Sequence, residues 1–371
     1  MPKKIKITSI VGARPNFMKI APLTREFARL KIIEHLLIHT GQHYDREMSG
    51  NFFKDLGIRT PDFNLNVGSG SHAVQTANIM IELEKIFIQE KPNLIVVVGD
   101  VNSTVAASLT ASKLHIPIAH VEAGLRSYDR DMPEEINRII TDQLSDFLFT
   151  TEPEAKNNLI KEGIKASKIF FVGNIMIDTL IYNLKKAKKL SPLKKYGLDL
   201  NKYSVVTLHR PGNVDNKKTL TNILGAFSVI QKDIPIVWPV HPRTKNMIKK
   251  FKLTPLLKKQ KNIYLLPPIS YLEFLSLMAN AKFVMTDSGG IQEETTALKI
   301  PCLTIRENTE RPITITQGTN VLAGIKMDNI VKQSQKITKN RGKRGKIPHY
   351  WDGKTAGRIT EIIINAMKKN G

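Results

Sequence analysis

Five short apolar runs in this chain of 371 residues lead directly into an acid or a histidine. The residues that follow the runs are Asp100, Glu122, His209, His241 and Asp287. If the runs are parallel strands, these side chains lie beyond the carboxyl ends of the strands, where open parallel sheets bind their ligands. Carboxylates from different loops are suited to proton transfer at carbon, and a histidine can supply a further acid. We therefore predict an active site built from strand ends.

Each of these residues also has a structural explanation, and the explanations differ in strength. Asp100 precedes a predicted helix and could simply cap it. Glu122 leaves an apolar strand, where it makes a poor cap and a poor surface residue, so a functional role is favoured. Glu134 starts another helix just after a proline, and helix propensity alone favours both residues there. For His209 and His241 a structural role is as common as a functional one.

Two glycine-containing turns predict contacts with phosphate. Asp287-Ser288-Gly289-Gly290 follows a predicted strand and opens a helix. Paired glycines let a phosphate approach the backbone, and the N-terminus of the helix binds it; a plain helix cap needs no second glycine. Gly12-Ala13-Arg14-Pro15 follows the first strand, where the Arg14 guanidinium can bind phosphate with two hydrogen bonds. An exposed turn is the alternative there, and Lys19, five residues further on, could equally be a surface lysine.

The chain lacks the usual sequence signatures of cofactors and metals. It has neither a P-loop nor a GxGxxG fingerprint, and no His, Asp or Cys residues have the spacing of a metal site. Its one cysteine, Cys302, lies in an apolar run and is interpreted as an inert core thiol. We expect an enzyme that binds a phosphate-bearing ligand, without a metal and without a nicotinamide cofactor; a nucleotide-sugar is the natural class of substrate.

The pattern of elements predicts an α/β fold. Short β-rich runs alternate with amphipathic segments, in two sets of six strands each, which indicates parallel βαβ units. We predict two Rossmann-like doubly wound domains that face a cleft. The expected domains are residues 1–173, which carry the acid–base residues, and residues 174–354, which bind the phosphate-bearing ligand. A predicted helix at 355–371 is expected to pack on the first domain.

The composition is that of a globular protein with an unusual charge. The net charge is +23, but the lysines are scattered over several segments and are not interleaved with aromatic residues. We interpret them mainly as solvated surface, with a polyanionic partner or steering of an anionic substrate as alternatives. No apolar stretch approaches the length needed to span a bilayer, and the first residues are interpreted as a strand. We expect a cytoplasmic protein with neither a membrane nor a nucleic acid as its partner.

Taken together, the motifs of the chain resemble those of a known family, the non-hydrolysing UDP-N-acetylglucosamine 2-epimerases. The resemblance runs in order over nearly the whole chain. The segments that carry it are Gly12-Ala13-Arg14-Pro15, Thr40-Gly41-Gln42-His43, Gly99-Asp100, His120-Val121-Glu122-Ala123-Gly124-Leu125-Arg126, Pro133-Glu134-Glu135-Ile136-Asn137-Arg138, Val172-Gly173-Asn174, His209-Arg210, Pro239-Val240-His241, Thr286-Asp287-Ser288-Gly289-Gly290-Ile291-Gln292-Glu293-Glu294 and the stretch from Arg306 to Pro312. The family has the glycosyltransferase-B type fold, and its members are usually dimers.

The resemblance implies a mechanism and a set of site residues. The family interconverts UDP-GlcNAc and UDP-ManNAc by eliminating UDP, which leaves 2-acetamidoglucal, and then adding UDP back. Asp100, Glu122 and Glu134 would transfer protons, in an order that the sequence leaves open, and His209 would attend the leaving diphosphate. The positions that would bind substrate are Arg14, Lys19, Arg138, His241, Ser288, Gly289, Gly290, Glu294 and Arg311.

The chain also departs from the family pattern. Many members read His-Arg-x-Glu-Asn where this chain has a glycine, Gly212, in place of the acid. The segment from Gln42 to Met48 matches the family's contacts to an activating second UDP-GlcNAc only in part, because Glu47 stands where a glutamine is usual. This segment also resembles the relatives that act on UDP-2,3-diacetamido-glucuronate. The alternatives are thus a 2-epimerase of that sugar, a hydrolysing epimerase, a glycosyltransferase of the same fold or a nucleic-acid-binding protein.

Overall fold

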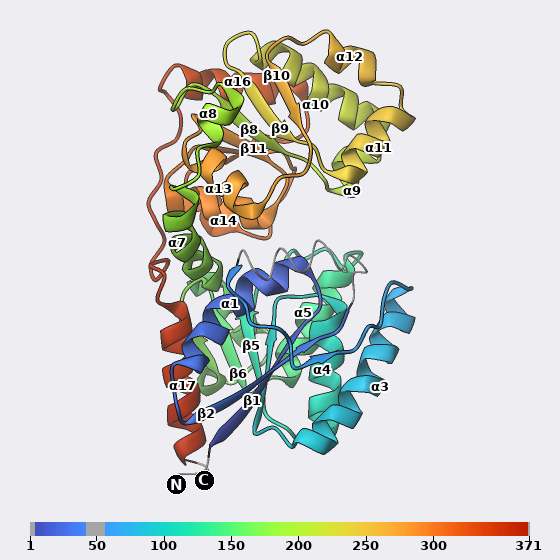
Figure 1. Ribbon diagram of the computed structural model, residues 1–371, viewed down its shortest axis with the longest axis vertical. Helices are drawn as coiled ribbons and strands as arrows, with labels where there is room; N and C mark the ends of the chain where they lie inside the picture. Colours follow the sequence, from blue (N-terminus) through green and yellow to red (C-terminus); the bar gives the residue numbers. More distant parts are fainter. Residues whose placement is uncertain (1–3, 42–55, 370–371) are drawn as a thin grey trace. The chain divides into compact units, whose positions relative to one another are not determined.

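The structure is a computed structural model that describes residues 4–41 and 56–369, and it divides the chain into two compact units (Figure 1). Unit 1 comprises Met1–Ile181 and His349–Gly371, and unit 2 comprises Tyr182–Pro348. The division falls inside a helix, α7 (Ile175–Ala187), whereas the sequence places the boundary before it, at residue 173. The predicted α/β class with parallel sheets is confirmed in both units.

The sheet of unit 1 has seven strands in the order β3-β2-β1-β4-β5-β6-β7, and neighbouring strands run parallel. Its strands are β1 (Ile5–Val11), β2 (Ile33–His39), β3 (Phe63–Asn64), β4 (Leu94–Val98), β5 (Ile118–Ala123), β6 (Phe147–Thr150) and β7 (Ile169–Phe171). The sequence predicts six of these, and the two-residue β3 is the one it misses. The order reverses between β1 and β4, and ligands bind at such a switch point in open α/β sheets.

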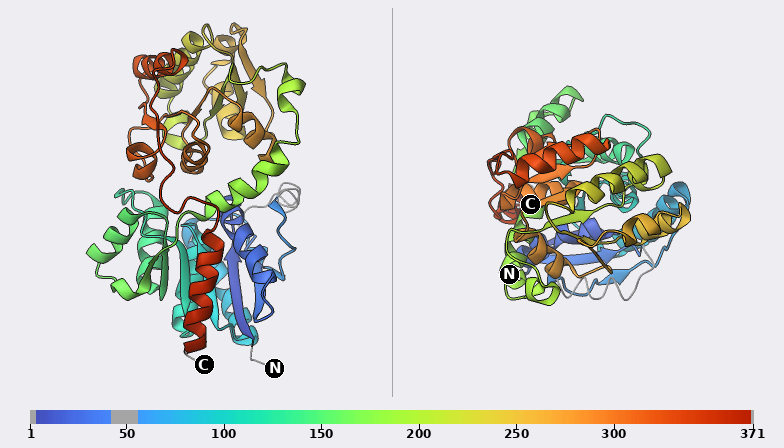
Figure 2. Two further views of the ribbon diagram at one scale, coloured as in Figure 1. Left: turned by 90° about the vertical axis from the view of Figure 1, so that its left-hand side faces the viewer. Right: turned by 90° about the horizontal axis from the view of Figure 1, so that it is seen from above.

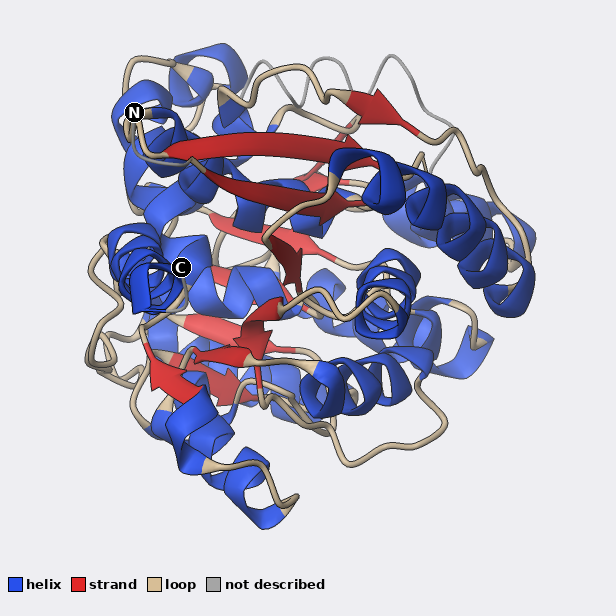
Figure 3. Ribbon diagram, turned by 90° about the horizontal axis from the view of Figure 1, so that it is seen from below, coloured by secondary structure: helices blue, strands red, loops and turns tan. Residues whose placement is uncertain are grey.

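Helices cover both faces of this sheet (Figure 3). The helices of unit 1 are α1 (Arg14–Ala28), α3 (His72–Glu90), α4 (Asn102–Lys113), α5 (Pro133–Leu144), α6 (Pro153–Lys161) and α17 (Thr355–Lys369), with a 3-10 turn at Ala166–Lys168. On one face, Ile79, Leu83 and Phe87 of α3 form a core with buried strand residues such as Ile95 and Val97. These side chains recur at the spacing of an amphipathic helix.

The C-terminal helix α17 belongs to unit 1 and packs against α1. The start of β1 and the end of α17 lie at the same end of the unit (Figure 2). Asp178 of α7 accepts hydrogen bonds from the backbone amides of Thr355 and Ala356, at 3.1 and 2.8 Å. It thereby caps the helix start from a distant part of the chain. The buried Trp351 donates to the Thr151 carbonyl oxygen at 3.2 Å, which fixes the segment that leads into α17.

Unit 2 repeats the same topology with six strands in the order β10-β9-β8-β11-β12-β13. The strands are β8 (Ser204–Thr207), β9 (Ile236–Pro239), β10 (Ile263–Leu266), β11 (Phe283–Thr286), β12 (Cys302–Thr304) and β13 (Asn320–Leu322). The helices are α8 (Pro192–Tyr196), α9 (Pro211–Val214), α10 (Lys217–Ile230), α11 (Pro242–Lys250), α12 (Thr254–Lys258), α13 (Tyr271–Ala279), α14 (Gly289–Leu298), α15 (Pro312–Thr316) and α16 (Met327–Thr338). Phe227 and Trp238 lie edge to face in its core. The strand order is that of a Rossmann fold, with the switch point between β8 and β11.

The helices found within residues 4–41 and 56–369 include none long and apolar enough to cross a membrane.

Candidate active site

Glu122 lies in a β-bulge at the carboxyl end of β5. Val121 pairs with Phe149 of β6, and Ala123 pairs with the next residue, Thr150, so Glu122 is an extra residue in its strand. Its φ angle is 76°, in the left-handed region that residues other than glycine rarely adopt. A side chain held in such a conformation at a strand end is a typical feature of a functional site. The sequence predicted the position of Glu122 but not this backbone geometry.

The carboxylate of Glu122 is paired with Lys19 of α1. The Lys19 Nζ atom lies 2.8 Å from Glu122 Oε2, and both side chains are buried. Gly99 makes this approach possible, because a Cβ atom at that position would lie 2.6 Å from Lys19 Nζ. The φ angle of Gly99, 69°, is a second reason for glycine at this position. The structure therefore brings together two predicted site residues, from β5 and α1, beside the β1–β4 switch point.

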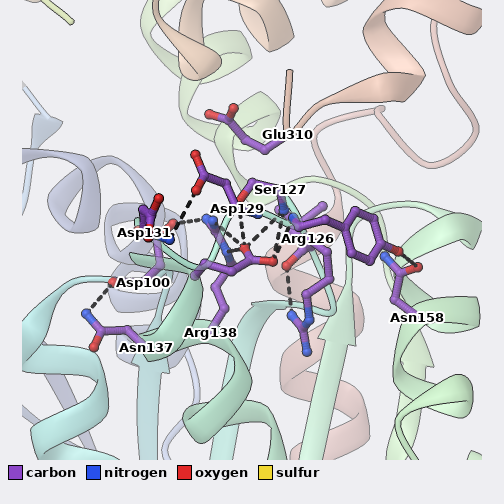
Figure 4. Close-up of polar contacts among 12 residues, drawn as sticks. Asp100, Arg126, Ser127, Asp129, Asp131, Asn137, Arg138, Asn158 and Glu310 are labelled. Carbon is purple, nitrogen blue, oxygen red and sulfur yellow. Dashed lines mark hydrogen bonds and ion pairs between the residues drawn. The ribbon is translucent and has the colours of Figure 1, made fainter. Parts of the chain in front are cut away.

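Asp100, which follows β4, is paired with Arg138 of α5 (Figure 4). The Arg138 Nη1 atom donates to Asp100 Oδ2 at 2.5 Å, while Nε and Nη2 donate to Glu135 at 3.0 and 2.8 Å. Asn137 holds the Asp100 carbonyl oxygen at 2.9 Å. Burial alone would raise the pKa of Glu135, but hydrogen bonds from the Ser127 amide and from Arg138 lower it. Arg138, predicted as a substrate contact, is thus held against Asp100.

The third predicted acid, Glu134, lies in the first turn of α5 and is half-buried. Its side chain makes no hydrogen bond or ion pair with the other described residues, in contrast to that of its neighbour Glu135. Two other predicted features cannot be placed. The side chain of Arg14 and the segment from Gln42 to Met48 lie outside the described part of the chain.

In unit 2, Asp287 holds His209 at the β8–β11 switch point. The fully buried Asp287 carboxylate lies 2.8 Å from His209 Nδ1 and accepts from the backbone amides of His209 and Arg210. Burial alone would raise the pKa of Asp287, but the hydrogen bond and charge of His209 and these amides lower it. The structure therefore gives Asp287 the role of fixing the ring of His209. The ring of His241 lies beside it, with the two centroids 5.6 Å apart.

The N-terminus of α14 presents backbone amides next to a cluster of arginines. The predicted residues Ser288, Gly289 and Gly290 lie here, and the Ser288 side chain makes no capping hydrogen bond within the described residues. A Cβ atom on Gly289 would lie 2.9 Å from Glu310 Oε1. Glu310 in turn forms ion pairs with two arginines, Arg210 and Arg306. A helix N-terminus of this kind can bind an anion.

Arg210 and Arg306 flank Glu310, with nitrogen–oxygen distances of 2.7 and 2.6 Å. Burial would raise the pKa of Glu310, but the charges of Arg210, Arg311 and Arg306 lower it to about 2. The carboxylate is therefore ionised at neutral pH and forms ion pairs with both Arg210 and Arg306. The sequence analysis missed Glu310 and Arg306 as members of this cluster, although both lie within the motif from Arg306 to Pro312.

The remaining predicted binding residues, Glu294 and Arg311, each contact a buried partner. Tyr271 of α13 donates a hydrogen bond to Glu294 Oε1 at 2.8 Å, and burial, with the charge of Glu294, raises the pKa of this tyrosine. The Arg311 Nε atom lies 2.7 Å from Glu293 Oε1, and both side chains are buried. Tyr271 carries no signal in the sequence, since only the fold places α13 beside α14. Within the parts of the chain that the structure describes, no three His, Cys, Asp or Glu side chains are grouped as metal ligands.

Comparisons with known proteins identify the family of the chain. A family model described as UDP-N-acetylglucosamine 2-epimerase matches residues 25–364. The UDP-N-acetylglucosamine 2-epimerase of Methanocaldococcus jannaschii is 45% identical over 364 residues, which are 97% of this chain and 99% of that relative. The UDP-2,3-diacetamido-2,3-dideoxy-D-glucuronate 2-epimerase of Pseudomonas aeruginosa is 40% identical over 363 residues, which are 97% of this chain and 99% of that relative.

A solved structure shows the same fold at similar identity. It is the crystal structure of the Methanocaldococcus jannaschii UDP-GlcNAc 2-epimerase in complex with UDP-GlcNAc and UDP. Its TM-score is 0.88 at 44% identity, and the match covers 97% of this chain and all of that chain. The family expected from the motifs is confirmed. The chain belongs to the UDP-N-acetylglucosamine 2-epimerase family and is an epimerase, that is, an isomerase.

Proposed function

We propose that the protein interconverts UDP-GlcNAc and UDP-ManNAc. The observation that carries this proposal is the pair of acids beside the switch point of unit 1, each matched by its own cation. Glu122 is paired with Lys19 at 2.8 Å, and Asp100 with Arg138 at 2.5 Å. An epimerase that inverts a carbon centre through a planar intermediate needs two proton-transfer groups, and two held carboxylates provide them.

The proposed reaction begins with loss of the C2 proton and of UDP. One carboxylate takes the proton from C2, a double bond forms between C1 and C2, and the C1–O bond breaks with its electron pair going to UDP. A second acid then protonates C2 of the resulting 2-acetamidoglucal from the other face, and a UDP oxygen bonds to C1 again. Asp100, Glu122 and Glu134 are the candidates for these transfers. The half-buried, unpaired Glu134 is the one without a fixed partner among the described residues.

Unit 2 is proposed to bind the UDP moiety. The amides at the start of α14 are oriented as in a phosphate site, and Arg210 and Arg306 add positive charge beside them. His209, fixed by Asp287, would attend the leaving diphosphate. Arg14, Lys19, Arg138, His241, Ser288, Gly289, Gly290, Glu294 and Arg311 remain the proposed substrate contacts. No cofactor takes part in this scheme. We also propose a cytoplasmic homodimer, as is usual for the family that the motifs resemble.

A second candidate substrate is UDP-2,3-diacetamido-glucuronate. The observation that favours it is the relative at 40% identity that is named for this sugar. The segment that resembles such relatives lies at residues 42–48, outside the described residues. Both candidates share the chemistry at C2 and differ only in the groups on C3 and C6 of the sugar.

One experiment separates these proposals. Each UDP-sugar is incubated with the pure protein and no acceptor, and proton NMR follows the anomeric signals. We expect UDP-GlcNAc to reach an equilibrium with UDP-ManNAc, with no added metal or NAD. Turnover of the diacetamido-glucuronate alone would change the substrate but keep the reaction. Release of free ManNAc and UDP in step would indicate a hydrolysing enzyme, and no turnover without an acceptor would indicate a glycosyltransferase.

A further inference from the structure

A buried histidine contacts the backbone that precedes Asp100 and lies two residues before Glu122, and both of its ring nitrogens face acceptors. His120 of β5 is fully buried, with Nε2 2.9 Å from the Gly99 carbonyl oxygen and Nδ1 2.7 Å from Asp142 Oδ1. A carbonyl oxygen can only accept, so Nε2 carries a proton. Nδ1 carries a second proton if Asp142 is a carboxylate. Whether Asp142 is ionised depends on the groups that surround it.

Asp142, on α5, is surrounded by donors. Its Oδ2 atom accepts from the Gly124 amide at 3.1 Å and lies 2.7 Å from Arg126 Nη2. Burial would raise the pKa of Asp142, but the charges and hydrogen bonds of His120 and Arg126 lower it. Asp142 is therefore ionised and can only accept, so the contact with His120 Nδ1 is one in which the ring donates. Glu162 pairs with Arg126 at 2.6 Å on the far side of the network.

The two oxygens of Asp142 bracket the bulge that carries Glu122. One oxygen holds His120, two residues before Glu122, and the other holds the amide of Gly124, two residues after it. Between these two anchor points the backbone adopts the φ angle of 76° at Glu122. Such an angle persists only where the surroundings impose it. The Asp142 carboxylate, together with the pairing to β6, supplies that constraint.

The same network holds the strand end that carries Asp100. The Gly99 amide donates to the Val121 carbonyl oxygen of β5 at 3.1 Å. The Gly99 carbonyl, which directly precedes Asp100, accepts from the side chain of His120. Gly99 is thus tied to β5 through both of its peptide groups. The backbone at Asp100 and the backbone at Glu122 are connected through one buried ring.

We propose that Asp142 is a positioning residue, which acts through His120 and Gly124 to hold Glu122 and Asp100 in their reactive arrangement. Asp142 touches neither substrate nor reacting atoms in this account. Its effect on turnover rests on the proposed function, because the two acids are the groups that it positions. Its effect on the backbone at Glu122 does not rest on that function and can be measured separately.

The kinetic test is Asp142→Asn, with Glu162→Gln as the matched control. Both substitutions turn a carboxylate of the same network into an amide, but Glu162 contacts neither end of the bulge. A misplacement of about 1 Å can cost roughly 10²-fold in rate, so we expect kcat of Asp142→Asn to fall by about that factor. The KM for UDP-GlcNAc should stay within about 3-fold, because Asp142 is buried and is not among the proposed substrate contacts. Glu162→Gln should keep kcat within about 3-fold of the wild type.

Circular dichroism on each variant separates loss of positioning from loss of folded protein. If Asp142→Asn does not fold, His120→Gln replaces it, since that change removes the ring that joins Asp142 to the Gly99 carbonyl. Equal losses in Asp142→Asn and Glu162→Gln would overturn the proposal. So would a loss of less than about 3-fold in the Asp142 variant.

A crystal structure of Asp142→Asn gives a readout that does not depend on activity. We expect the φ angle of Glu122 to relax and its contact with Lys19 to be lost. If the wild-type protein shows no epimerase activity, the proposed function fails, and this crystal structure still decides whether Asp142 holds the bulge. An unchanged Glu122 conformation in the variant would refute the positioning role, whatever the activity.

Discussion

Glu122 combines two costly features, a left-handed backbone conformation and a buried carboxylate. The first is imposed by the bulge, and the second is compensated by Lys19 at 2.8 Å. Asp100 is partly exposed and carries its own cation, Arg138. Each acid is thus held by a partner from another element, which leaves its carboxylate in a defined place. Preorganised acids of this kind are what proton transfer at carbon requires.

Asp100→Asn and Glu122→Gln should each lower kcat by roughly 10²–10⁴-fold, the usual contribution of one acid–base group. Binding of UDP should survive, because these groups are proposed to face the sugar. Steady-state kinetics and calorimetric titration with UDP measure the two effects. Asp131→Asn, which alters an exposed carboxylate nearby, is the control and should be neutral. Full activity in Asp100→Asn would contradict the acid–base role of Asp100 and leave it as the partner of Arg138 alone.

At this scale the sequence predicted residues at strand ends but not what holds them. Asp100 and Glu122 follow or end neighbouring strands of unit 1, and His209 follows a strand of unit 2, because parallel strands of one sheet bring their carboxyl ends to one edge. The partner Asp142 lies 20 residues after Glu122, in the last turn of α5, and the sequence around it does not show which groups it contacts. Tyr271, the partner of Glu294, likewise could not be identified from the sequence. Such partners depend on how helices dock, which local patterns do not encode.

The proposed phosphate site at the start of α14 depends on the helix N-terminus and its two glycines rather than on one side chain. A valine at Gly290 would place a branched side chain at the helix N-terminus, where the diphosphate is proposed to approach. We expect Gly290→Val to weaken UDP binding by about 10-fold or more, measured by calorimetry, with a native circular-dichroism spectrum. Gly357→Val, at the third residue of α17, is the matched control, because open space surrounds that glycine. Unchanged UDP affinity in Gly290→Val would contradict the phosphate site.

The cap of α17 predicts a pH-dependent stability. Burial raises the pKa of Asp178 to about 6, although hydrogen bonds from the amides of Ala356 and Thr355 act in the opposite direction. The folded state therefore binds this proton more tightly than the unfolded chain, whose value is 3.8. The stability that results is full below about pH 4 and is lost as the pH rises to about 6.

Asp178→Asn removes this titration and keeps a side chain that can still accept a hydrogen bond. Urea unfolding of both proteins between pH 4 and pH 7 measures the difference. The free energy of unfolding of the wild type, relative to the variant, should fall as the pH rises to about 6 and stay level above it. A difference that is constant over this range, or one that grows with pH, would show that Asp178 titrates normally.

Most elements of the fold could be predicted from the sequence, because buried parallel strands are continuous apolar runs. β4 and β11, for example, lie within the predicted ranges. β3 has only two residues, too few to show any periodicity, and so it was missed. β5 begins at Ile118 rather than at the predicted Ile116, and it continues through Glu122 to Ala123. The bulge explains this extension, since it keeps a polar residue within a strand.

On the scale of the whole molecule, the positive charge is concentrated in unit 2. Residues 182–348 contain 31 of the 56 Lys and Arg residues but only 10 of the 33 Asp and Glu residues, a net charge of +21. The rest of the chain, with 25 basic and 23 acidic residues, has +2. The unit that is proposed to bind the UDP dianion is thus the one with the attractive field.

This asymmetry predicts a strong dependence on ionic strength. Raising NaCl from about 20 to 300 mM should lower kcat/KM by roughly 5-fold or more, because salt screens the field of the exposed lysines. The kcat at saturating substrate should change little, since the bound substrate no longer has to be attracted. Initial rates over a salt series measure both parameters. A kcat/KM that does not vary with salt would assign the lysines to solvated surface alone.

In the proposed reaction, carboxylates of unit 1 exchange the proton at C2 of a UDP-sugar. NMR of UDP-GlcNAc incubated with the protein in D₂O, without metal, NAD or acceptor, follows this exchange atom by atom. We expect UDP-ManNAc that carries deuterium at C2, together with deuterium entering the UDP-GlcNAc pool. Asp142→Asn should slow both changes together. UDP-ManNAc that retains the original proton at C2, or no change in the sugar at all, would rule out the proposed reaction.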